Sequence, residues 1–133
     1  MSTNSDYFKS ALRKIGVLAE GKTPSPEQGA DMLVIFNDML DYLRGEGIDF
    51  GAPQASTTGT PDIPEGYREI VKCMLAIRAA DHFETVAPPA VVYIATQGQN
   101  RMLREMIYAE AIPRDFDHLP FGSYRRLNIL TGQ

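Results

Sequence analysis

The chain has 133 residues, of which 44% are hydrophobic, so it can form one domain with a modest core but not two. This hydrophobic fraction excludes wholesale disorder. The net charge is -4, and residues 1–66 hold five basic and ten acidic side chains, so no general DNA-binding surface is expected there. A single cysteine, Cys73, excludes an internal disulfide, and the polar N-terminus lacks a signal-peptide pattern, so we expect a protein of the reducing cytoplasm.

The first expected helix covers residues 6–19. Asn4 or Ser5 could cap it, and Gly16 is expected to weaken its last turn. Its apolar positions recur at helical spacing, with lysine and arginine on the opposite face. These positions are Phe8, Leu12, Ile15 and either Val17 or Leu18.

The second expected helix covers residues 26–44 and has a clear start signal. Ser25 and Gln28 match a capping box, and Pro26 stands at the first helical position, where its missing N–H is not needed. Gly45 and Gly47 supply the stop. The apolar stripe consists of Met32, Ile35, Phe36, Met39, Leu40 and Leu43.

Residues 48–61 form a connection without helical period, rich in Gly, Pro, Ser and Thr. Connections of this length inside a small domain are usually functional or disordered. We therefore expect a protruding loop that a partner orders.

The third expected helix, over residues 63–83, is the one around which the rest is organised. Pro64 suits its first turn, and its apolar residues cover most of the circumference, so it should be enclosed by other helices. Met74 and Ile77 are predicted to lie on its most apolar face. Its charged residues make it unsuited to span a membrane, and these are Arg68, Lys72, Arg78 and Asp81.

The fourth expected helix runs over residues 90–111, and Pro113 is expected to end it. Ala95 and Gly98 are small enough to let another helix approach closely. The predicted packed face consists of Val91, Ile94, Ala95, Gly98, Met102, Met106 or Ile107, and Ala109.

Residues 114–133 show no helical period yet are too apolar for a solvated tail. Arg125 and Arg126 alternate with apolar residues, which fits either an edge strand with one wet side or an arm that adds to a neighbour's sheet or groove. The sequence therefore predicts an all-α fold: a four-helix bundle-like domain (1–113), a long protruding loop and an extended C-terminal arm (114–133).

The catalytic signals are sparse. The best local candidate is the run Asp115, Asp117 and His118, whose oxygen and imidazole ligands could hold a divalent ion, with Asp81 or Glu84 from the core. A polar turn is the favoured interpretation of this run. Cys73 has no sequence neighbour that would activate it, so a buried, inert thiol is expected.

The order of these features resembles the head-to-tail adaptor family of tailed phages, also called tail accessory or packaged-DNA stabilisation proteins. The resemblance spans the chain: ALRKIGV at residues 11–17, the acidic second helix with its Gly-rich end, GYREIVKCMLAIRAADHF at 66–83, and LPFGSYRRLNILTG at 119–132. It implies a structural virion protein without catalysis, cofactor or metal, placed at the head–tail junction and assembled in the host cytoplasm.

The resemblance also implies partners. Family members form a homo-oligomeric ring, usually of twelve copies, under the portal protein, and packaged DNA passes through the lumen without sequence-specific binding or any membrane. The portal interface is carried over to Tyr124, Arg125, Arg126, Leu127, Ile129 and Leu130. The contact with the downstream tail protein, a nozzle or hub, is carried over to Phe50, Gln54, Thr57 and Thr58.

Two other classes stay open. One is a small metal-dependent enzyme that uses the Asp115–His118 run. The other is a DNA-binding or regulatory helical protein, which would need a basic recognition helix that none of the four expected helices provides.

Overall fold

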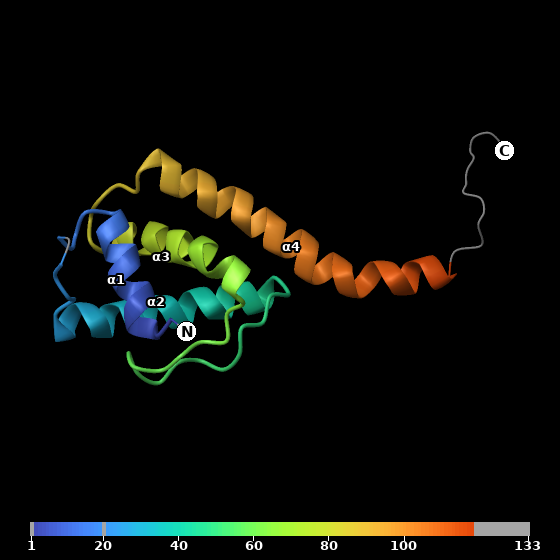
Figure 1. The fold of residues 1–133 in the computed structure, drawn as a ribbon, viewed down its shortest axis with the longest axis horizontal. Coiled ribbons are helices and arrows are strands. Elements are labelled where there is room, and N and C mark those ends of the chain that lie inside the picture. The colour runs from blue at the N-terminus through green and yellow to red at the C-terminus, as the bar shows by residue number, and fades with distance from the viewer. Residues whose placement is uncertain (1, 20, 119–133) are drawn as a thin grey trace.

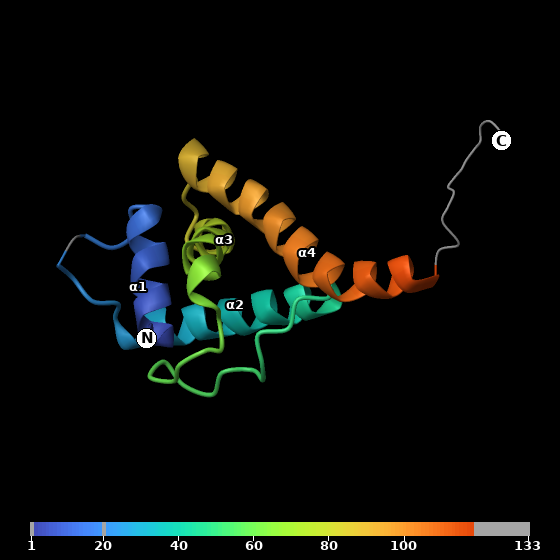
Figure 2. The ribbon, with the colours of Figure 1, turned by 45° about the vertical axis from the view of Figure 1, so that its right-hand side comes forward.

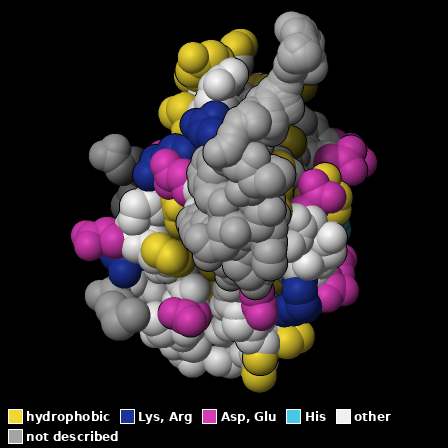
Figure 3. All heavy atoms as spheres, turned by 90° about the vertical axis from the view of Figure 1, so that its right-hand side faces the viewer, with side chains coloured by type: hydrophobic (Ala, Val, Ile, Leu, Met, Phe, Trp, Pro, Cys, Tyr) yellow, Lys and Arg dark blue, Asp and Glu magenta, His cyan; other side chains and the backbone are white. Residues whose placement is uncertain are grey.

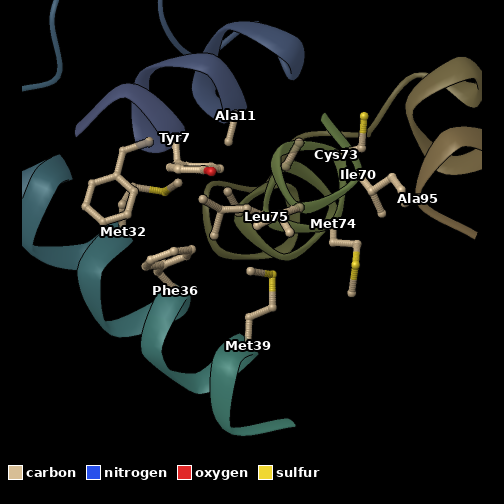
Figure 4. Close-up of a cluster of buried hydrophobic side chains, with 14 of the residues drawn as sticks. Tyr7, Ala11, Met32, Phe36, Met39, Ile70, Cys73, Met74, Leu75 and Ala95 are labelled. Carbon is tan, nitrogen blue, oxygen red and sulfur yellow. The ribbon is translucent and has the colours of Figure 1, made fainter. Parts of the chain in front are cut away.

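The computed structural model describes residues 2–19 and 21–118, with side chains up to residue 107. The described residues form four α-helices, a short 3₁₀ turn and no strand, which confirms the all-α class. The elements are α1 (Asn4–Lys14), α2 (Pro26–Gly45), η1 (Glu65–Tyr67), α3 (Arg68–His82) and α4 (Pro89–His118). Helix α3 lies in the middle, with α1 and α2 on one side and α4 on the other (Figures 1 and 4).

Helix α1 is shorter than expected and begins earlier. Its cap is Thr3, whose hydroxyl accepts from the Asp6 amide while the Asp6 carboxylate accepts from the Thr3 amide at 3.0 Å. The expected caps were wrong because this reciprocal pair satisfies two amides that the first turn leaves open. The helix ends at Lys14, before Gly16 with its φ of 79°. The last residues of the expected range therefore lie in a turn.

Helix α2 matches its predicted start and ends one residue later than expected. Ser25 accepts from the Gln28 amide at 3.2 Å, and the Gln28 side chain accepts from the Ser25 amide at 3.0 Å. The chain leaves the helix through Gly47, whose φ of 99° is costly for any other residue. The capping box and the glycine stop are thus confirmed.

The expected enclosure of α3 is confirmed. Figure 4 shows Leu75 inside a cluster that includes Tyr7 of α1 and Phe36 of α2, and the Phe36 ring packs 5.9 Å from that of Tyr7. Ile77 is only partly buried, so its assignment to the most apolar face was wrong. The reason is that Ile77 lines a surface groove beside Tyr42, where α2 and α4 diverge around α3.

Helix α4 approaches α3 closely at Gly98, as the small residues predicted. A Cβ atom at this position would lie 2.5 Å from the side chain of Ile70, so only glycine fits without a shift. Val91, Ala95 and Met102 are buried on the same face, whereas Ile94 is exposed, contrary to expectation. The α3–α4 crossing therefore sets the packed face of α4.

Pro113 does not end α4, because the helix continues to His118. A proline inside a helix removes one backbone hydrogen bond and crowds the preceding turn, which kinks a helix without necessarily terminating it. The ribbon of α4 changes direction in its last part and runs past the end of the helical core (Figures 1 and 2). The first residues of the expected arm thus belong to α4, and residues 119–133 lie outside the described residues.

We expect Leu75→Ala to lower the free energy of unfolding by about 2–5 kcal/mol, because Leu75 is fully buried and truncation leaves a cavity. Ile77→Ala should cost only roughly 1–2 kcal/mol, in proportion to its partial burial. Denaturant titration of both variants measures the difference, with exposed Val34→Ala as a control. An equal cost for Leu75→Ala and Ile77→Ala would contradict the burial described here.

We expect Gly98→Ala to destabilise the protein by roughly 1–3 kcal/mol, since the added methyl group overlaps Ile70. Gly45→Ala is the matched control, because a Cβ atom on Gly45, also helical, meets nothing within 4 Å. Thermal unfolding should show a lower midpoint for Gly98→Ala alone. A neutral Gly98→Ala would mean that α4 sits farther from α3.

Candidate functional site

The loop over residues 48–61 is anchored in the domain at its start, although most of residues 51–60 are exposed. Ile48 and Phe50 are buried in the core, with Phe50 only 3% exposed, and Ile63 just after the loop is buried with them. Ile48 and Phe50 turn inward while Asp49 between them is exposed, but this segment does not pair as a strand. The loop was expected to stand out because its composition is polar, but its few large apolar residues gain more by entering the core.

Hydrogen bonds to α1 and α2 fasten the rest of the loop. The Asn37 amide donates to the Gln54 carbonyl at 2.9 Å and accepts from the Gln54 amide at 2.8 Å. The buried Asn4 donates to the Gln54 side chain at 3.0 Å and to the Ser56 carbonyl at 2.8 Å. Two asparagines thus supply the partners that this irregular backbone needs.

This packing changes the expected tail interface. Phe50 is buried, and the Gln54 side chain accepts from Asn4 and donates to the Ala52 carbonyl, so neither side chain is free to meet a partner in this conformation. Thr57 is partly buried and Thr58 is exposed. The four predicted residues therefore do not form one contact surface.

The other sequence-predicted residues lie at the end of α3, in the last turns of α4 or outside the described residues. The expected portal-interface residues, Tyr124, Arg125, Arg126, Leu127, Ile129 and Leu130, lie outside the described residues. The backbone of Asp115, Asp117 and His118 belongs to the last turns of α4. Asp81 and Glu84 lie where α3 leads into the start of α4, about 40 Å of helix away, so they cannot complete a metal site with that run.

Within the described side chains, no group of three or more His, Cys, Asp or Glu lies close enough together to hold a metal ion. Burial raises the pKa of the Cys73 thiol, so its nucleophilic thiolate is disfavoured. Cys73 is buried, as expected.

Large apolar side chains reach the surface on α2 and α4, a feature that the helical periodicity did not predict. Tyr93 on α4 is 67% exposed and Val34 on α2 is 61% exposed; Val92, Ile107 and Tyr42 are also exposed. In Figure 3, hydrophobic side chains lie among acidic and basic ones on the face toward the viewer. Exposed apolar groups of this size favour contact with a partner when they lie together.

An open groove of about 540 Å³ between α1 and α3 gathers most of the basic charge of the first half. Its lining consists of Asp6, Lys9, Ser10, Arg13, Lys14 and Lys72. Sequence reasoning missed it because its residues come from two helices far apart in the chain. The only signal was the basic face of the first expected helix.

The outer side of α2 carries the opposite charge. Its inward positions include Met32, Phe36 and Met39, all fully buried, which turns the other side of the helix to solvent. His82 pairs with one of these outward acids, since its Nε2 lies 3.4 Å from an oxygen of Asp31. We call the outward row of residues on α2 the acidic stripe; it consists of Glu27, Asp31, Val34, Asp38 and Asp41.

A polar cluster also links η1 to α4. The Tyr67 hydroxyl donates to Glu105 at 2.7 Å, and Arg101 donates to the same carboxylate at 3.1 Å while lying over the Tyr67 ring. The hydrogen bond to Glu105 raises the pKa of Tyr67 and lowers the pKa of Glu105. The cluster is exposed, so it orients α4 more than it stabilises it.

No protein-family model matches the chain, and no curated protein sequence matches it. Among the helices that the structure describes, none combines the length and the apolar character needed to cross a membrane.

We expect Asn37→Ala to release the loop and to lower the free energy of unfolding by about 1–3 kcal/mol, because the Gln54 N–H and carbonyl each lose their hydrogen bond to the Asn37 side chain. Hydrogen exchange of the amides from Gln54 to Gly59 should accelerate, while exchange in α3 follows global stability. Gln97→Ala, exposed on α4, is the control. Unchanged exchange at Gln54 would show that the loop is held by its apolar residues alone.

Proposed function

We propose that this chain is a structural virion protein: a head-to-tail adaptor of a tailed phage. In this proposal twelve copies form a ring beneath the portal protein, join the DNA-filled head to the tail and help to retain the packaged DNA. The helical bundle forms the ring wall, and the segment from Arg114 to the C-terminus reaches the portal. Assembly occurs in the host cytoplasm, and no cofactor, metal or catalytic step is involved.

The observation that carries the proposal is the form of α4. The helix runs over Pro89–His118, extends past the core and exposes Val92 and Tyr93 on its outer side (Figures 1 and 2). A long helix with apolar groups on both sides gains free energy when a second surface covers the outer side. In this proposal the portal protein supplies such a surface, and the order of sequence features supports the same family.

The loop has a smaller role in this proposal than the sequence suggested. Phe50 and Gln54 hold the loop on the domain, and exposed Thr58 is the part of the predicted tail interface that a downstream nozzle or hub protein could contact. A fastened loop presents its exposed residues in one geometry, which reduces the ordering cost of binding.

We expect the full chain, mixed with the portal protein of the phage that encodes it, to form a ring-on-ring complex visible by electron microscopy. Truncation after Gly122 should abolish this complex, because it removes the apolar residues and both arginines of the expected portal interface. The helical circular-dichroism signal and the thermal midpoint should change little.

A full-length Arg125→Ala/Arg126→Ala variant serves as the matched control for the charge contribution. It keeps the apolar residues, so it should weaken portal binding without abolishing it. A truncated chain that binds the portal with normal affinity would overturn the assignment of the arm. A full chain that never binds the portal would overturn the proposed function.

A further inference from the structure

The fold separates charges of opposite sign onto two surfaces, although the chain as a whole is acidic. Four cationic side chains and one carboxylate line the groove between α1 and α3. Lys14 is paired with Glu69 at 2.6 Å, and Lys72 lies 5.7 Å from the centre of the Tyr7 ring. Among the described side chains, Lys9 and Arg13 have no carboxylate in ion-pair distance. Arg13 donates one hydrogen bond to the Lys22 carbonyl at 3.2 Å, so Lys9 and the remaining donors of Arg13 are available to a partner.

The stripe on α2 has the chemistry that such a groove would recognise. Its acids stand three to seven residues apart on one helical face, with exposed Val34 between Asp31 and Asp38. Asp41 is paired with Arg44 at 2.8 Å and Asp31 lies 3.4 Å from His82, so Glu27 and Asp38 are the stripe acids without an ion-pair partner among the described side chains. Lys9 and Arg13 are four residues apart on α1, which is about 6 Å along a helix. Glu27 and Asp31 have the same separation, so two helices lying side by side can match cation to carboxylate.

The two surfaces lie on opposite sides of the core. Figure 4 shows α1 and α2 on either side of the cluster that contains Tyr7 and Phe36, and the acidic stripe faces away from Phe36. A molecule with complementary surfaces on opposite sides binds copies of itself head to tail. Repetition of such a contact closes into a ring when the rotation between copies allows it.

We propose that the groove between α1 and α3 binds the acidic α2 stripe of a second copy of this chain. Val34 can pack against the aliphatic stems of the lysine and arginine side chains in the groove, and the charges around it set the register. The inference names the subunit–subunit surfaces of the ring and therefore rests on the proposed function. Nucleic acid is the weaker occupant. The groove attracts phosphate groups only at short range, whereas the net charge of -4 on the whole chain repels them at longer range.

A charge-swap experiment tests the contact with the full chain. One variant, Lys9→Glu/Arg13→Glu, makes the groove acidic, and another, Asp31→Lys/Asp38→Lys, makes the stripe basic. Each alone should associate at least about tenfold more weakly than the wild type in sedimentation at low salt. An equimolar mixture should associate again, because both surfaces of one variant then complement both surfaces of the other.

Arg104→Glu, a charge reversal on α4 outside both surfaces, should associate like the wild type. Circular dichroism confirms that each variant is folded; Lys9 is half-buried and the other substituted positions are exposed, so the changes should be tolerated. Raising the salt concentration should weaken the wild-type contact, since exposed charges are screened.

Restored association in the mixture supports the inference. Variants that associate like the wild type, or a mixture that stays dissociated, overturn it, and so does a wild-type chain that remains monomeric. Portal binding, measured separately for each variant, decides the proposed function independently. If the wild type binds a labelled 30-base-pair DNA duplex and Lys9→Glu/Arg13→Glu does not, while self-association is unchanged, the groove is a nucleic-acid surface instead.

Discussion

The burial of α3 on nearly all of its sides is the constraint on which the other elements depend. A 15-residue helix that is apolar on most of its circumference must bury most of its surface, so α1, α2 and α4 cover it. Leu75 packs toward Tyr7 and Phe36, while Ile70 meets Gly98 on the far side. The same burial raises the pKa of the Cys73 thiol and keeps it unreactive.

The close contact at Gly98 has consequences for the rest of α4. Because the helix is held against α3 on one face, its outer side and its last turns are left for other contacts. Tyr67, Arg101 and Glu105 add a polar link that orients α4 near the point where it passes the core. The helical core thus presents a long helix with exposed apolar groups on its outer side.

Positive and negative side chains lie on different sides of the fold, which the net charge of the chain does not reveal. The first half of the chain is acidic in total, yet α1 contributes its cations to one side and α2 its carboxylates to the other. Like charges gathered on one surface repel each other unless an opposite surface neutralises them. In the proposed ring, a second copy of the chain would offer that surface, which links the charge pattern to the proposal.

The sequence by itself determined the helical class, the start of α2 at Ser25 and the enclosure of α3, because capping and hydrophobic period are local signals. It also indicated the close approach at Gly98, because the small side chains of Ala95 and Gly98 leave room for a neighbouring helix. The tertiary structure alone decided the place of the loop, where Asn4 and Asn37 supply partners from distant helices. The groove of Lys9 and Lys72 likewise exists only after α1 and α3 pack, because no spacing along one helix could reveal a surface built from two.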